Sequence, residues 1–212
     1  MLRGDNSRGQ QHRLRPEQSF LAKYPEGAGT PMAYRILNIT SVLSRVWASV
    51  RVKHLERWVA QWAGPAMFAG VPGAGAEEGW YLTQLDFEIK RLTGSQVAAG
   101  SIDVYKCFDQ IVRPLVVALA RAAGMPTAVL STYEAFQDNL AVYNHIGTGL
   151  GTPHQHRCSI PQGCPFSMAL VTLLVRPWMY CMRDIGWSRG CWQTTCSSMP
   201  PAHTMHQPQS VG

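Results

Sequence analysis

No stretch of the chain is apolar over the ~20 residues that a helix needs to cross a bilayer, which excludes a transmembrane helix. The first stretch, MLRGDNSRGQQHRLR, lacks the apolar centre of a secretory signal. The six cysteines form no Cys-x-x-Cys pair, so we expect free thiols and no disulfide partner. These absences predict an intracellular protein, nuclear or cytoplasmic, without a membrane partner.

Acidic residues are scarce: 13 Asp and Glu stand against 19 Lys and Arg, a net charge of +6. The imbalance is strongest near the N-terminus, where residues 1–57 hold 10 of the basic residues and only four acids. A basic half of this kind favours a polyanionic partner such as nucleic acid. The alternative interpretation is a solvated leader.

The order of periodic segments indicates the fold class. Residues 1–33 are polar and rich in Gly, Pro, Arg and Gln, and we expect little structure there. Apolar spacing predicts helices over 43–62, 81–92, 112–123 and 166–182, and another that starts at residue 127. It also predicts strands over 97–105 and 140–146, and a turn at Gly147, Gly149 and Gly151 follows the second strand. After Ile185 neither period continues. Irregular alternation of strands and helices predicts a mixed α+β domain.

Two carboxylates stand six residues apart in SIDVYKCFDQI (101–111). Asp103 lies near Val97, Ile102 and Val104 at the end of the predicted strand, where a carboxylate suits a hard divalent cation such as Mg²⁺. Asp109 precedes an apolar helical pattern, and we expect it to cap or brace that helix.

Several stretches, taken in order, resemble the fingers and palm motifs of reverse transcriptases, in particular those of non-LTR retrotransposons and group II introns. SIDVYKCFDQI is similar to the palm motif that carries the first catalytic aspartate, and SIPQGCPFSM (159–168) to the Pro-Gln-Gly turn that follows it. Upstream, YRILNITSVLSRVWASVR (34–51) and FAGVPGAGAEEGWY (68–81) resemble fingers segments. The resemblance covers residues 20–186.

The resemblance implies part of a right-hand polymerase fold: helical fingers and an incomplete palm with an antiparallel sheet, the thumb being absent. The domains expected from it are a basic leader with the start of the fingers (1–33), the fingers (34–96), a partial palm (97–186) and an irregular tail (187–212). The implied reaction is DNA synthesis on an RNA template by two-metal nucleotidyl transfer from deoxynucleoside triphosphates to a DNA primer.

The resemblance also implies roles for single residues. Asp103 would be catalytic and bind Mg²⁺. The nucleotide-binding residues would be Lys23 and Arg35 on the triphosphate, the backbone at Val104, Phe108 as the ring that excludes a 2′-hydroxyl, and Gln162 and Gly163 against the nascent base pair. Each has a plainer alternative: Phe108 in the core, Lys23 and Arg35 on the surface, and Gln162 in a turn.

The chain departs from the family where a second palm hairpin should carry two adjacent aspartates. No Asp-Asp pair occurs in the sequence, and no acidic residue follows Asp184. If two bases are skipped in the codons of residues 191–196, the shifted reading frame encodes Leu-Ala-Asp-Asp, provided that Gln193 is encoded by CAG and Thr194 by ACG. We therefore hypothesise a frameshift near Gly186, and we expect no polymerase activity from the chain as it stands.

Three other interpretations stay open. The chain is a non-catalytic nucleic-acid-binding remnant of a retroelement, or a relic that hardly folds. In the tail, Cys191, Cys196, His203 and His206 are an alternative set of zinc ligands, although their spacing fits common zinc patterns poorly.

Overall fold

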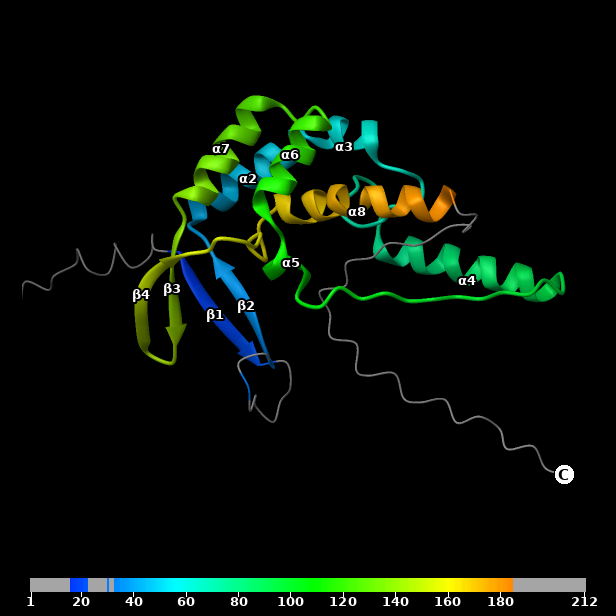
Figure 1. Cartoon of the computed structure of the whole chain (residues 1–212), viewed down its shortest axis with the longest axis horizontal. Coiled ribbons are helices and arrows are strands. Elements are labelled where there is room, and N and C mark those ends of the chain that lie inside the picture. The colour runs from blue at the N-terminus through cyan, green and yellow to red at the C-terminus, as the bar shows by residue number, and fades with distance from the viewer. Residues whose placement is uncertain (1–15, 23–29, 31–32, 185–212) are drawn as a thin grey trace, which may run out of the picture.

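The structure is a computed structural model, and it describes residues 16–22, 30 and 33–184. Within these residues it is a mixed α+β fold, as the sequence predicts: a four-stranded sheet lies beside a layer of helices (Figure 1). The helices are α2 (Val42–His54), α3 (Glu56–Trp62), α4 (Ala76–Leu92), α5 (Cys107–Gln110), α6 (Arg113–Ala122), α7 (Thr127–Asp138) and α8 (Phe166–Asp184).

The sheet is built from two hairpins with strand order β2-β1-β3-β4. The strands are β1 (Glu17–Ala22), β2 (Tyr34–Ile39), β3 (Ala141–Ile146) and β4 (Gly149–Gln155). Each hairpin is antiparallel, but β1 and β3 pair in parallel, with Glu17 opposite Tyr143. The sheet is therefore mixed, which corrects the antiparallel sheet expected from the resemblance.

Helix α8 is the centre of the apolar core. Its first ten residues, FSMALVTLLV, are almost wholly apolar, and seven of its residues are buried. The middle of α8 is tied to the end of α3 and to the loop after it, because Arg176 Nε donates to the Trp62 carbonyl at 2.9 Å and Thr172 Oγ1 donates to the Ala69 carbonyl. The same helix packs against α6 and α2. Because the start of α8 is buried, the position of the Pro-Gln-Gly turn that precedes it is fixed as well.

The apolar period over 43–62 predicts one helix, and the structure has two. The chain turns at Leu55, which ends α2 and precedes α3. Leu55 is 3% exposed, and Trp58 of α3 donates its indole N–H to the Ala123 carbonyl at 2.7 Å. The break allows α3 to bury its own apolar residues against a different part of the core than α2 does.

Three further expectations are wrong. The 1–33 leader contributes β1, because its EQSFLA segment pairs with β2 on one side and β3 on the other. The expected fingers segment 34–96 begins with strand β2 rather than with a helix. Gly149 and Gly151 lie in β4, so only Gly147, at φ 59°, has the left-handed backbone of the turn.

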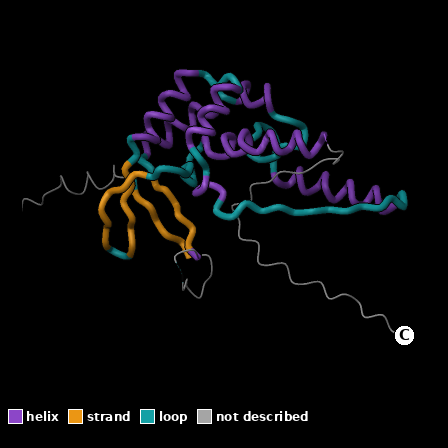
Figure 2. The backbone as a smooth tube through the Cα atoms, in the orientation of Figure 1, coloured by secondary structure: helices purple, strands orange, loops and turns teal. Residues whose placement is uncertain are grey.

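The predicted strand over 97–105 is absent. Helix α4 projects from the helical layer, and the chain returns from it as an extended loop (Figure 2). No described strand pairs with this loop, and residues 95–105 are all exposed. A strand needs a neighbour to accept and donate its backbone hydrogen bonds, so an apolar sequence alone does not create one. The apolar face predicted for α4 is exposed as well, at Tyr81, Leu85, Ile89 and Leu92.

Candidate functional site

Two segments that the resemblance assigns to different palm motifs lie side by side. The Ser159 amide donates to the Ile111 carbonyl at 2.8 Å, and the Ile160 amide donates to the Phe108 carbonyl at 3.0 Å. Ile111, Phe108 and Ile160 are buried in the same apolar core. Helix α5 is thereby joined to the Pro-Gln-Gly turn, although about fifty residues separate them in the sequence.

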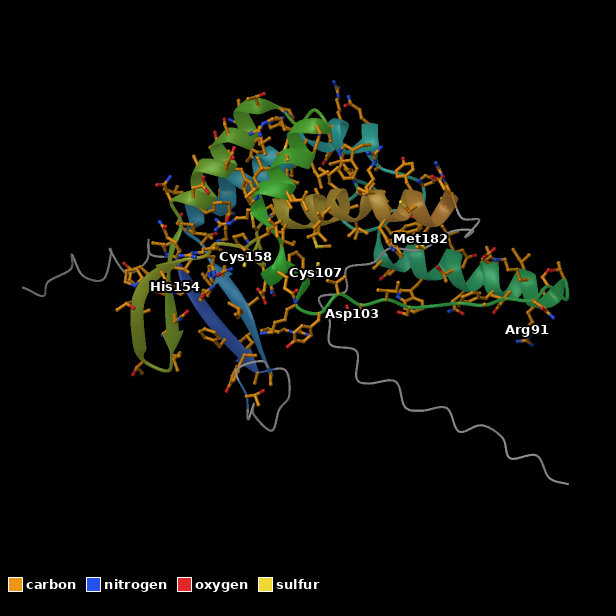
Figure 3. All side chains as sticks on the ribbon, in the orientation of Figure 1. Arg91, Asp103, Cys107, His154, Cys158 and Met182 are labelled. Atoms are coloured by element: carbon orange, nitrogen blue, oxygen red, sulfur yellow. The ribbon has the colours of Figure 1, made fainter. Side chains whose placement is uncertain are left out.

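Side chains join the same two segments. Gln162 Nε2 donates to Asp109 Oδ1 at 3.4 Å, and the Cys158 thiol donates to the Asp109 carbonyl at 3.4 Å. Figure 3 shows Cys107 and Cys158 in this region, between the sheet and α8. Asp109 therefore braces the turn that carries Gln162.

Asp109 is not the cap of the following helix. It lies inside the short helix α5, and α6 begins two residues after α5 ends, with Val112 at its N-cap position and no side-chain cap. Pro114 in the first turn has no amide hydrogen, so one of the four free amides at the start of α6 is absent.

Backbone strain occurs on both sides of this contact. Lys106 has φ 46° and precedes α5, and Ser159 has φ 90° and is 8% exposed. They are the only non-glycine residues with positive φ in the described part of the chain. A non-glycine residue in these regions costs on the order of 1–3 kcal/mol, and such residues cluster at binding and catalytic sites. The strain marks the two segments as a candidate site.

Asp103 lies outside the paired segments. It is exposed on the extended loop that returns from α4, as Figure 3 shows, rather than at the end of a buried strand. Val104, beside it, is also exposed. No described strand pairs with the loop that carries Asp103.

No group of three or more His, Cys, Asp or Glu side chains gathers anywhere in residues 16–22, 30 and 33–184. Asp103 would supply one carboxylate, and Asp109 already accepts a hydrogen bond from Gln162. Mg²⁺ bound by protein usually needs one or two carboxylates together with substrate phosphates, so the Mg²⁺ role expected for Asp103 stays a prediction.

The remaining predicted residues fall in different places. Phe108 is 6% exposed and belongs to the core, as its plainer alternative has it. Gly163 has φ 92° with open space around it, so the turn itself requires glycine there. Arg35 lies in β2 opposite Leu21, and no described contact joins it to Asp103 or Gln162. Lys23 lies outside the described residues, as does the alternative zinc set in the tail.

Sequence reasoning missed a polar cluster where the sheet meets the helices. Gln18, which is 2% exposed, donates through Nε2 to Asn38 Oδ1 at 2.7 Å and to His156 Nε2. His154 lies beside His156, with ring centroids 5.0 Å apart. The strand β1 that supplies Gln18 was not expected, so no sequence signal pointed to this cluster.

Burial lowers the pKa of His156, and the neighbouring charges of His154 and Arg113 lower it further, against the opposing effect of Asp109. The hydrogen bond agrees with this direction, because a neutral imidazole nitrogen can accept from Gln18 and a protonated one cannot. His156 is therefore a neutral acceptor at neutral pH. The charge of Asp109 acts on His156, so this cluster is electrostatically related to the candidate site.

Comparison with known proteins gives no family. No protein-family model matches the chain, and no curated protein matches it.

In the described residues, no helix has the length and apolar character needed to cross a membrane. The four described cysteines, Cys107, Cys158, Cys164 and Cys181, form no disulfide with one another.

Proposed function

We propose that this chain is a fingers and palm piece of a reverse transcriptase from a retroelement. The observation that carries the proposal is the contact between α5 and the Pro-Gln-Gly turn, which brings the two motifs with the strongest resemblance into one strained site. If the likeness of these two short motifs were due to chance, there would be no reason for them to lie together in the fold. Membership of one functional site is such a reason.

The chain as it stands is inactive in this proposal. Asp103 belongs to no group of three or more His, Cys, Asp or Glu side chains among the described residues, and no described strand pairs with the extended loop that carries it. Both deficits have one explanation if an Asp-Asp hairpin that pairs with this loop has been replaced by the tail. Such a hairpin would supply the missing carboxylates and would order residues 97–105 as a strand.

An extension assay tests the proposal. The chain is incubated with an RNA template, a DNA primer, deoxynucleoside triphosphates and Mg²⁺, beside a version whose reading frame is restored after Gly186 and continued through the downstream open frame. We expect no extension from the first and extension from the second. Asp103→Asn in the restored version is expected to reduce extension to background, while Asp86→Asn, on α4, leaves it unchanged.

Two results would count against the proposed enzyme. In the first, the restored version does not extend the primer; in the second, it extends the primer equally well with Asp103→Asn. Folding of every variant is checked by its melting temperature, so that loss of activity is separated from loss of structure.

A second candidate function is nucleic-acid binding without catalysis, and the exposed basic residues of α2 and α3 favour it. Arg45, Arg51, Lys53 and Arg57 are exposed, and none forms an ion pair with another described residue. Exposed cations of this kind are available to phosphates. The basic surface that they form does not depend on the missing carboxylates.

Charge reversal at Arg51 and Lys53 tests this surface. We expect the chain to bind an RNA–DNA hybrid with an affinity that falls steeply with salt, and Arg51→Glu with Lys53→Glu to lower the affinity at least tenfold and to reduce the salt slope by about 2. Fluorescence anisotropy at several salt concentrations measures both. Lys90→Glu with Arg91→Glu, both on the projecting α4, changes the net charge by the same amount and is the control. Equal losses in the control and in the variant of Arg51 and Lys53 would argue against specific binding through α2.

A further inference from the structure

Helix α4 carries an apolar stripe that the fold leaves exposed. The four members of this α4 stripe lie three or four residues apart on one side of the helix: Tyr81, Leu85, Ile89 and Leu92. Leu92 is 85% exposed, and the helix projects from the helical layer (Figure 2). A continuous apolar stripe on an exposed helix marks a place where a partner docks.

Acidic side chains border the α4 stripe. Glu78 lies three residues before Tyr81 and therefore projects beside the stripe. Glu88 lies four residues before Leu92 and has a corresponding position near the other end. Both carboxylates are exposed, and neither forms an ion pair with another described residue. A partner of this stripe therefore needs basic groups at the edges of its own apolar surface.

The basic residues of α4 lie on other sides of the helix. Lys90 directly follows Ile89, so it lies about 100° around the helix from the stripe. Arg91 directly precedes Leu92 and lies about 100° away in the other direction. Lys90 also forms an ion pair with Asp86 at 2.8 Å. The edges of the α4 stripe therefore keep a negative charge.

Helix α2 carries a second exposed apolar stripe, and its edges are basic. The members of this α2 stripe are Val42, Leu43, Val46 and Val50. Arg45 lies three residues after Val42, and Lys53 has the same position relative to Val50, so both exposed cations project beside the stripe. The sequence of α2, VLSRVWASVRVKH, contains no acidic residue. The α2 stripe thus has the apolar surface and the charge that the α4 stripe requires.

The charges of the two helices agree when the helices run antiparallel. Glu78 and Glu88 are about 15 Å apart along α4 at the rise of an α-helix. Arg45 and Lys53 are about 12 Å apart along α2, a similar spacing. In the antiparallel orientation the acidic first turn of α4 lies beside the basic last turn of α2. A parallel orientation would place the basic last turns of both helices together.

We propose that copies of this chain associate head to tail, with the α4 stripe of one copy docked on the α2 stripe of another. Both stripes are exposed within a single copy, so they meet only between copies. Each contact leaves one α2 stripe and one α4 stripe free at the ends of the pair, so assembly continues with concentration unless a ring closes. The inference does not depend on the proposed polymerase origin.

Sedimentation equilibrium of the full chain, without nucleic acid and at low ionic strength, tests the proposal. Two short helices form an interface at the low end of the size range, so we expect the average mass to rise only towards about 0.1 mM chain. Glu78→Lys with Glu88→Lys is expected to weaken association by about tenfold or more, because like charges then meet. Arg45→Glu with Lys53→Glu is expected to do the same. The variant with all four substitutions has complementary edges again, and we expect it to associate as the parent chain does.

A matched control separates the α2 stripe from net charge. Arg51→Glu with Arg57→Glu changes the net charge as much as the variant of Arg45 and Lys53 does. Arg51 directly follows Val50 and lies about 100° around α2 from the stripe, and Arg57 lies on α3. We expect this control to associate as the parent chain does. Equal losses in the two variants, or no recovery with all four stripe substitutions, would overturn the proposal.

Neutral substitutions show which stripes meet. Leu85→Gln with Ile89→Gln interrupts the α4 stripe, and Val46→Gln with Val50→Gln interrupts the α2 stripe. All four positions are exposed and glutamine is a good helix former, so we expect the melting temperatures to change little. Each variant alone is expected to stay monomeric. Their mixture keeps one intact stripe of each kind and is expected to form a dimer with one copy of each variant and nothing larger.

Three results would overturn the head-to-tail contact. The first is a parent chain that stays monomeric at the highest concentration. The second is association that is lost with the α4 substitutions and kept with the α2 substitutions, which would indicate contact between two α4 helices. The third is a mixture of the two glutamine variants that forms no dimer.

Discussion

Replacing Gly70 with Ala is expected to lower the free energy of unfolding by about 3 kcal/mol or more, because the new methyl group has no space. A Cβ at this position would lie 2.6 Å from the Met168 carbonyl carbon and 2.7 Å from the Ala169 amide nitrogen, both backbone atoms of α8. Gly70 also has φ +66°, so the substitution adds left-handed strain to the steric clash. Backbone atoms of a buried helix cannot move away as a flexible side chain can.

Gly73→Ala is the matched control. Gly73 lies in the same loop at φ +77°, but no atom lies within 4 Å of a Cβ built there. It carries the backbone strain alone, for which we expect a loss of about 1–2 kcal/mol. Urea unfolding of both variants separates the two effects. Equal losses would show that Gly70 does not approach α8 as closely as the structure has it.

The second large effect is expected at Phe166, the first residue of α8. Phe166→Ala removes a ring that is 1% exposed and contacts Trp47 of α2 and Tyr133 of α7, so we expect a loss of about 3–5 kcal/mol. The loss includes a contribution from the cavity left between α2, α7 and α8. Urea unfolding measures it, and near-ultraviolet circular dichroism reports the changed environment of Trp47.

Phe20→Ala is the control for Phe166. Phe20 is half-buried on β1 and has one aromatic neighbour, Tyr34, with ring centroids 6.5 Å apart. Truncation there removes less buried surface, and we expect a clearly smaller loss. A loss at Phe166 no larger than that at Phe20 would place the centre of the core elsewhere than at the start of α8.

Helices with strong apolar periods were predictable from the sequence. The patterns over 81–92, 112–123 and 166–182 and the start at Thr127 correspond to α4, α6, α8 and α7, and the strand over 140–146 corresponds to β3. A helix satisfies its own backbone hydrogen bonds, so its sequence carries most of the information needed to form it. Ends were less accurate, as the break at Leu55 shows.

Strands were less predictable because each depends on a partner. The EQSFLA segment becomes β1 only because β2 and β3 lie on either side of it, and the sequence of the segment does not indicate these partner strands. The VAAGSIDVY segment has a more strand-like composition, yet it stays an exposed loop among the described residues because no strand lies beside it. The difference lies in the neighbours and not in the local sequence.

The candidate site was predictable in part. The resemblance related the 103–109 region to Gln162, and the structure joins them through Asp109 and the Phe108 backbone. The roles within the pair differ, because Asp109 braces the turn and Phe108 is buried in the core. The cluster around Gln18 and His156 lay beyond sequence reasoning, since it depends on a parallel pairing of β1 with β3.

The nucleotide sequence across codons 184–200, read in genomic DNA and in the transcript, tests the central claim most directly. The account predicts CAG at Gln193 and ACG at Thr194, so that the shifted frame reads Leu-Ala-Asp-Asp beneath residues 191–195, with an inserted or deleted base near Gly186 relative to an intact copy. Any other codon at Gln193 or Thr194 would leave no Asp-Asp pair in the shifted frame. That result would contradict the origin of this chain from a reverse transcriptase by frameshift.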